Sequence, residues 1–197
     1  MSGIVSIHNR LYTYYDLERD LQELAICYPD STELTSLGQT LDHRQIYCLR
    51  IHGTKGFTKH AVVIQAAMHA REWKNAQLLM MMAERFLRCY GEDILWEGIP
   101  YRQLLRHYDV YILPMVNPDG VQISQFGSEG IIDPVLRQEL QEKIATQPPT
   151  QRETLAPYIT RINKSLPNSS VPKICAALGA FRRSMTTIAF GSCVLRI

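Results

Sequence analysis

The earlier part of the chain carries hydrophobic patterns that predict strands. Residues 61–64 and 110–116 form short apolar runs rich in β-branched side chains, which is typical of strands buried in a sheet. Residues 32–37 and 45–52 are also predicted strands, and the second of them has the alternation of side chains that a strand requires. We therefore expect these segments to form a sheet.

Apolar side chains recur at helical spacing in two longer segments. After Thr13 and Asp16, which have the spacing of a capping box, they predict a helix that ends before Pro29. After the strand at residues 61–64 they predict a longer helix that runs to about Tyr90, with Gly91 as the glycine that follows its last residue. Helices are therefore expected before the strands and between them.

A further helix is predicted to begin at Asp133, because this residue can cap a helix and Pro134 suits its first turn. Strands and helices that follow one another in this way indicate an α/β fold. We expect a mixed, mostly parallel sheet flanked by helices.

The hydrophobic pattern stops after Asn163. A polar linker with Pro148 and Pro149 precedes a last predicted helix at residues 153–163, and residues 164–197 mix small and apolar side chains without a period. We therefore divide the chain into a structured unit at residues 1–163 and an aperiodic tail at residues 164–197. Two explanations of the tail stay open, disorder and translation out of frame.

Composition narrows the class of protein. Of the 197 residues, 46% are hydrophobic, which suits one domain with a core, and the formal net charge of +2 gives no attraction for nucleic acid or anionic membranes. No apolar run reaches the length of a membrane span, and the first residues lack the pattern of a signal peptide. The five cysteines are odd in number and have no Cys-x-x-Cys spacing, which favours reduced thiols and a cytoplasmic location.

The candidate chemistry lies where the strand at residues 61–64 gives way to a helix. His69 and Glu72 are three residues apart, so one turn of chain can direct an imidazole and a carboxylate to the same side. A catalytic zinc ion takes three such protein ligands and keeps a fourth position for water. The simpler alternative is a surface pair at the start of a helix.

Two motifs connect this junction to a known family. The segment His-Ala-Arg-Glu-Trp at residues 69–73 follows a strand, and a second strand ends in Asn-Pro-Asp-Gly at residues 117–120. In this order they resemble the two landmarks of the zinc carboxypeptidase family. Residues 121–127 are similar to the bacterial branch that cleaves the γ-D-glutamyl–diaminopimelate bond of cell-wall peptides.

The resemblance implies a zinc metallopeptidase with zinc as its cofactor, His69 and Glu72 as metal ligands and Arg71 as a substrate-binding residue. Its partners would be a peptide or a peptidoglycan fragment, with no nucleic acid and no membrane, and the oligomeric state stays open. One departure is that His43 precedes Arg44 where the family usually carries a Gly-Arg pair. An ion pair of Arg71 with a nearby carboxylate is the structural alternative to its binding role.

The resemblance covers residues 12–162, which correspond to the N-terminal half of the family's catalytic domain. The family's third zinc ligand is a later histidine, but no histidine follows His107 in this sequence, and no glutamate matches the family's general base. His107 itself is expected at the end of the sheet opposite to His69. The alternative to an active peptidase is therefore a catalytically inactive fragment or binding module of the same fold.

Overall fold

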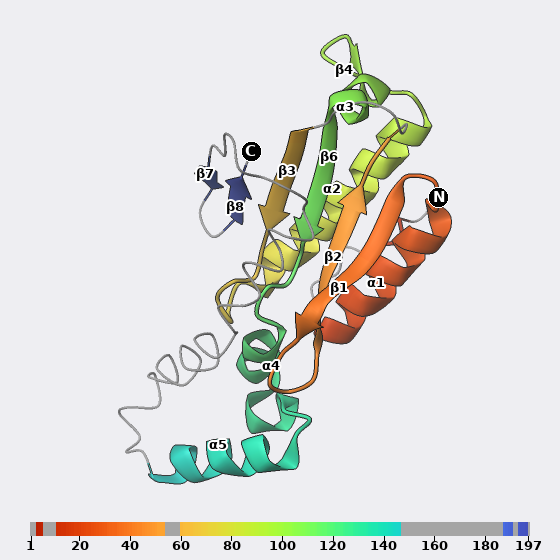
Figure 1. Ribbon diagram of the computed structural model, residues 1–197. Helices are drawn as coiled ribbons and strands as arrows, with labels where there is room; N and C mark the ends of the chain where they lie inside the picture. Colours follow the sequence, from red (N-terminus) through yellow and green to blue (C-terminus); the bar gives the residue numbers. More distant parts are fainter. Residues whose placement is uncertain (1–2, 6–10, 54–59, 147–186, 191–192, 197) are drawn as a thin grey trace.

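The computed structural model describes residues 3–5, 11–53, 60–146, 187–190 and 193–196. Its elements follow one another much as the hydrophobic pattern predicts (Figure 1). The helices are α1 (Tyr14–Cys27), α2 (Trp73–Gly91), α3 (Tyr101–His107), α4 (Pro118–Phe126) and α5 (Pro134–Thr146), with a 3-10 turn η1 (Gly127–Gly130). The strands are β1 (Thr32–Gln39), β2 (Gln45–Ile51), β3 (His60–Gln65), β4 (Leu95–Trp96), β5 (Ile99–Pro100), β6 (Tyr108–Leu113), β7 (Thr187–Phe190) and β8 (Cys193–Arg196).

The main sheet has the strand order β1-β2-β6-β3-β8-β7, and β4 pairs separately with β5. The predicted mixed α/β sheet flanked by helices is confirmed, but among the described strands it is not mostly parallel. Only β3 and β6 pair in parallel there, and the other pairs of the main sheet are antiparallel. The physical reason is chain connection, since β1 and β2 are joined by a short turn that allows only an antiparallel hairpin, and α2 gives β3 and β6 the crossover that a parallel pair needs.

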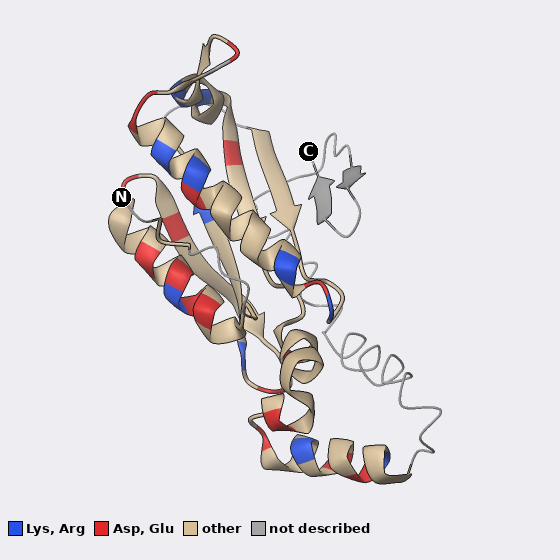
Figure 2. Ribbon diagram, turned by 180° about the vertical axis from the view of Figure 1, so that it is seen from behind, with Lys and Arg blue, Asp and Glu red and all other residues tan. Residues whose placement is uncertain are grey.

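The helices α1 and α2 pack on the same face of this sheet (Figures 1 and 2). Their inward side chains form one hydrophobic core with the strands, in which Leu21, Leu49 and Met80 are fully buried. A smaller core of Ile123, Ile131 and Leu140 joins α4 to α5 at one end of the molecule. The long helices thus hold β3 and β6, whose ends carry the candidate chemistry.

The predicted helix starts at Thr13 and Asp133 are confirmed, whereas one predicted helix end is wrong. The Thr13 hydroxyl accepts a hydrogen bond from the Asp16 amide and the Asp16 carboxylate accepts one from the Thr13 amide, which makes the capping box. The Asp133 carboxylate accepts the amides of Val135 and Leu136 at the start of α5. Gly91 is the last residue of α2 itself, and the residue that follows the helix is Glu92. Glu92 has a right-handed backbone with φ −84°, so the helix end does not need the left-handed conformation for which glycine is favoured.

The strands β7 and β8 lie within the tail that carries no hydrophobic period. The backbone of β8 pairs with β3, and β7 pairs with β8. Residues 147–186, which include the predicted helix at residues 153–163, lie outside the described residues. Within the described part, none of the helices has the length and apolar composition needed to span a membrane.

Candidate metal centre

His69 and Glu72 meet in the connection between β3 and α2. The His69 Nδ1 atom lies 2.9 Å from Glu72 Oε1, and the His69 backbone amide donates to Glu72 Oε2 at 3.4 Å. The side chains are 69% and 24% exposed respectively, so solvent and a metal ion can reach them. The structure therefore brings the two predicted ligands together at the surface, at the C-terminal end of β3.

This connection is held in place by the segment that follows β6. The Ala66 amide donates to the Leu113 carbonyl at 3.0 Å, and the Val116 and Asn117 amides donate to the carbonyls of Ala66 and Ala67 at 3.1 Å each. These bonds continue the parallel pairing of β3 and β6 beyond the ends of both strands. The C-terminal edge of a parallel strand pair, where α/β proteins place ligands, thus carries both sequence motifs.

Arg71 is exposed and lies between the two candidate ligands in the sequence. Within the described residues, its side chain has no hydrogen bond or ion pair. The ion pair that was the structural alternative for Arg71 is therefore absent from this part of the protein, and its guanidinium is available to a ligand.

The donor atoms fit zinc, since an imidazole nitrogen and a carboxylate oxygen are two of its usual ligands. Among the described residues, however, no third histidine, cysteine, aspartate or glutamate lies close enough to complete a metal site. His107 ends α3 just before β6, and because β3 and β6 are parallel it lies at the opposite end of the sheet from His69. The described residues therefore bring together two side chains of the kinds that bind zinc, but not a third.

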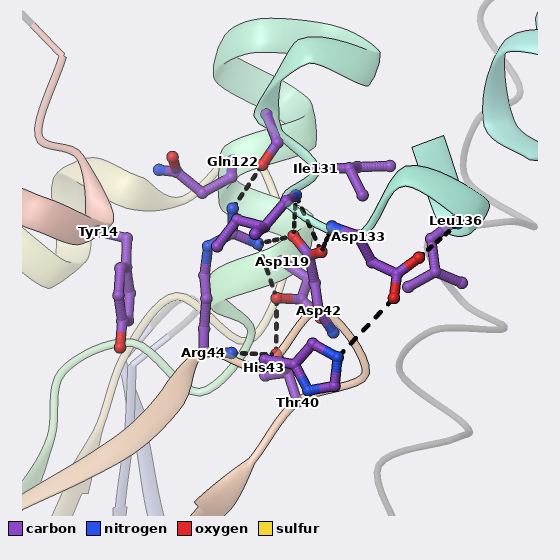
Figure 3. Close-up of polar contacts among 12 residues, drawn as sticks. Tyr14, Thr40, Asp42, His43, Arg44, Asp119, Gln122, Ile131, Asp133 and Leu136 are labelled. Atoms are coloured by element: carbon purple, nitrogen blue, oxygen red, sulfur yellow. Dashed lines mark hydrogen bonds and ion pairs between the residues drawn. The ribbon is translucent and has the colours of Figure 1, made fainter. Parts of the chain in front are cut away.

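A buried polar cluster lies behind this edge of the sheet, and sequence reasoning did not predict it (Figure 3). The Arg44 side chain is only 2% exposed. One terminal nitrogen of its guanidinium donates to the carboxylates of Asp42 and Asp119, and the other donates to the Gly130 carbonyl. The Asp42 carboxylate in turn accepts the backbone amides of Ile132 and Asp133. Arg44 thus ties the β1–β2 turn to the start of α4 and to the segment before α5.

Asp119, the third residue of the Asn-Pro-Asp-Gly motif, belongs to this cluster. Burial raises the pKa of its carboxyl group, while hydrogen bonds from the Thr40 hydroxyl and Arg44 act in the opposite direction. The Asp42 amide also donates to Asp119, at 3.2 Å. Asp119 thus links the Asn-Pro-Asp-Gly motif to a buried arginine far away in the sequence.

His43 occupies a backbone conformation that favours glycine. Its φ angle is 61°, in the left-handed region, at the position where the family usually carries glycine before the arginine. Its side chain is 68% exposed and makes only a distant contact with Asp133, 3.8 Å between Nε2 and Oδ2. Histidine in place of glycine therefore adopts this left-handed conformation at a cost in backbone strain.

Replacing His43 with glycine is expected to stabilise the protein. A residue other than glycine in the left-handed region destabilises the folded state by about 1–2 kcal/mol. Glycine removes this strain, but its greater freedom stabilises the unfolded chain by about 0.5–1 kcal/mol, which offsets part of the gain. We expect His43→Gly to raise the free energy of unfolding by about 0.5 kcal/mol in urea titrations. The control is His107→Gly, at a helical position, where the same change is expected to lower the free energy of unfolding. A loss of stability in His43→Gly would contradict the proposed backbone strain at His43.

Comparisons with known proteins find relatives among the carboxypeptidases. The family model described as "Zinc carboxypeptidase" matches residues 17–146, which is more than half of the chain. The chain is 33% identical to carboxypeptidase B of Rattus norvegicus over 113 residues, covering 55% of this chain and 26% of that protein. It is 30% identical to metallocarboxypeptidase A of Trichophyton rubrum over 115 residues, covering 58% of this chain and 26% of that protein.

The fold is shared with a solved structure. The crystal structure of thrombin activatable fibrinolysis inhibitor superimposes with a TM-score of 0.56 at 23% identity, covering 66% of this chain and 32% of that chain. The chain spans about a quarter of the length of the curated relatives named above. The matched region contains both motifs and every described helix and strand from β1 to α5. By this match the chain belongs to the zinc carboxypeptidase family, whose members use zinc.

Proposed function

We propose that His69 and Glu72 hold a zinc ion that serves peptide hydrolysis. The observation that carries this proposal is the 2.9 Å contact between His69 Nδ1 and Glu72 Oε1 at the exposed end of β3. An imidazole and a carboxylate at this distance can share one metal ion when the proton between them is replaced. Family membership supports the choice of zinc.

The residues of this site would have two tasks, binding the metal ion and binding the substrate. When bound, zinc supplies a Lewis acid and a water molecule of lowered pKa for attack on a carbonyl carbon. His69 and Glu72 would orient that site, and the exposed guanidinium of Arg71 would hold a carboxylate of the substrate by charge-assisted hydrogen bonds. Both tasks need exposed side chains, and His69 and Arg71 are exposed.

A second candidate is a module that binds zinc or peptide without turnover, and the missing third ligand favours it for this chain on its own. A catalytic zinc uses three protein ligands, but the described residues provide two. A general base contributes about 10²–10⁴-fold to such a reaction, and no glutamate here matches the base of the family. Under this second candidate, the chain on its own is expected to bind zinc weakly and not to hydrolyse peptides.

Substitution of His69 tests the metal site. Loss of a residue that merely orients a ligand costs about 10–100-fold in metal affinity, so loss of a ligand in His69→Ala is expected to cost about 100-fold or more. Zinc affinity is measured by competition with a chromophoric chelator, and peptide hydrolysis is assayed in parallel. The control is His107→Ala, which removes an exposed histidine from the other end of the sheet.

Two outcomes would contradict these proposals separately. Equal zinc affinity in His69→Ala and the unsubstituted chain would remove the assignment of the metal site. Tightly bound stoichiometric zinc with turnover that disappears in His69→Ala would show a complete site, and the proposal of an inactive chain would be wrong.

For the substrate we propose the γ-D-glutamyl–diaminopimelate linkage of cell-wall peptides. The support is the likeness of residues 121–127 to the bacterial branch with that activity, and an exposed Arg71 suits a substrate rich in carboxylates. The named relatives are carboxypeptidases, so peptides of L-amino acids are the competing substrate class.

Arg71→Ala is expected to weaken binding of γ-D-glutamyl-diaminopimelate by about 10–150-fold, because a hydrogen bond to a charged group contributes about 1.5–3 kcal/mol. Isothermal titration calorimetry with zinc present measures this change, and glycyl-phenylalanine serves as the comparison ligand. Arg102→Ala, which removes another exposed arginine, is the control. Tighter binding of glycyl-phenylalanine would contradict the proposed substrate, and unchanged affinity in Arg71→Ala would contradict the role of this residue.

A further inference from the structure

The side chain of Asn117 connects the two sequence motifs. It is almost fully buried, with 2% exposure. Its Oδ1 atom accepts the Gly120 amide at 3.0 Å and so caps α4. Its Nδ2 atom donates to the Met68 carbonyl at 3.3 Å. One amide group thus serves both the start of a helix and the residue that precedes His69.

The bond to Met68 acts directly on the proposed ligands. The Met68 carbonyl and the His69 amide belong to one planar peptide group, so the direction of the first fixes the direction of the second. That His69 amide donates to Glu72 Oε2 at 3.4 Å, while His69 Nδ1 contacts Glu72 Oε1. Asn117 therefore holds one end of a peptide group whose other end orients the glutamate.

Asn117 is itself held rigidly. Its backbone amide donates to the Ala67 carbonyl at 3.1 Å. A methyl group on Gly120 would lie 2.4 Å from Asn117 Nδ2, so there is no room for the amide to move toward that residue. Two residues further on from Asn117, Asp119 binds the buried guanidinium of Arg44 at 3.0 Å. The Arg44 cluster thereby anchors the first turn of α4 and the asparagine that begins it.

We infer that Asn117 is a positioning residue for the His69–Glu72 pair, which it orients through the peptide group of Met68 and His69. This inference rests on the proposed zinc-binding role of the pair. Asn117 has no hydrogen bond to the side chain of either ligand, and its effect is to reduce the number of orientations that the β3–α2 connection samples before a metal ion binds. Partners that orient ligands in this way typically change metal affinity by about 10–100-fold when they are removed.

Two substitutions separate the connection to Met68 from the helix cap. Asn117→Asp has the same shape and keeps an oxygen for the Gly120 amide, but it replaces the donor that faces the Met68 carbonyl. Asn117→Ser also keeps a capping oxygen and is too short to reach that carbonyl. Thr13→Ala is the matched control, since it removes the capping hydroxyl of a different helix, α1.

The 197-residue chain is measured in two ways, by hydrogen exchange of the amides at residues 66–72 without metal and by zinc affinity from chelator competition. Both Asn117 variants are expected to exchange these amides about tenfold faster and to bind zinc about tenfold more weakly. Thr13→Ala is expected to change neither quantity. Faster exchange shows that the connection is loosened, and this readout does not depend on zinc.

The remaining outcomes distinguish this inference from the proposed function. If His69→Ala weakens zinc binding but neither Asn117 variant does, the metal site stands and the inference is overturned. Unchanged amide exchange in both variants also overturns it, whatever the zinc affinity. If His69→Ala binds zinc as well as the unsubstituted chain, the proposed site fails, and the role of Asn117 in orienting ligands fails with it.

Discussion

Replacing Arg44 with alanine is expected to lower the free energy of unfolding by about 3–5 kcal/mol, the cost of removing one partner from a buried ion pair. The substitution leaves the carboxylates of Asp42 and Asp119 without their shared cation, at sites where both side chains are nearly inaccessible to solvent. The Gly130 carbonyl also loses a donor. Burial already raises the pKa of Asp119, and removal of the guanidinium is expected to raise it further.

Urea unfolding followed by circular dichroism measures this loss. The matched control is Arg102→Ala, because Arg102 pairs with Asp93 at 3.5 Å with both side chains more than half exposed. An exposed pair of this kind contributes about 0–1 kcal/mol. A similar small change in Arg44→Ala and Arg102→Ala would mean that the cluster does not hold α4 and the segment before α5 in place.

Replacing Gly130 with alanine is expected to destabilise the protein by about 3 kcal/mol, near the upper end for forcing an extra carbon into a packed interior. An added Cβ would lie 2.4 Å from the backbone oxygen of Gln122 in α4 and 2.7 Å from its carbonyl carbon. Backbone atoms of a helix cannot rotate away as a flexible side chain can, so η1 would have to move from α4. That movement also displaces the carbonyl that accepts from Arg44.

The same substitution at Gly91 provides the control, with the opposite sign. No atom lies within 4 Å of a Cβ added to Gly91, the last residue of α2. Gly91→Ala is therefore expected to stabilise the protein by about 0.4–1 kcal/mol, chiefly because alanine restricts the unfolded chain. Thermal unfolding of both variants measures the contrast, and equal effects at the two glycines would contradict the close approach of η1 and α4.

The sequence alone was sufficient to predict the features that depend on residues close to one another along the chain. The capping box of Thr13 and Asp16 and the cap at Asp133 follow from short-range hydrogen bonds within one turn of chain. The apolar runs at β3 and β6 identify two strands of the sheet, although the β-branched side chains of β3 are only partly buried. His69 and Glu72 belong to the same group, since a separation of three residues is enough to bring their side chains together.

Tertiary structure decided the features that join distant parts of the chain. Nothing near Arg44 in the sequence indicates that its partners would be Asp119 and Gly130, which approach it only when the β1–β2 turn packs against α4 and η1. The contact between Asn117 and Met68 likewise requires the parallel pairing of β3 with β6. Hydrophobic periodicity specifies which face of an element is buried, but the partner of a buried polar group is set by the packing of whole elements, and that information is spread over the entire fold.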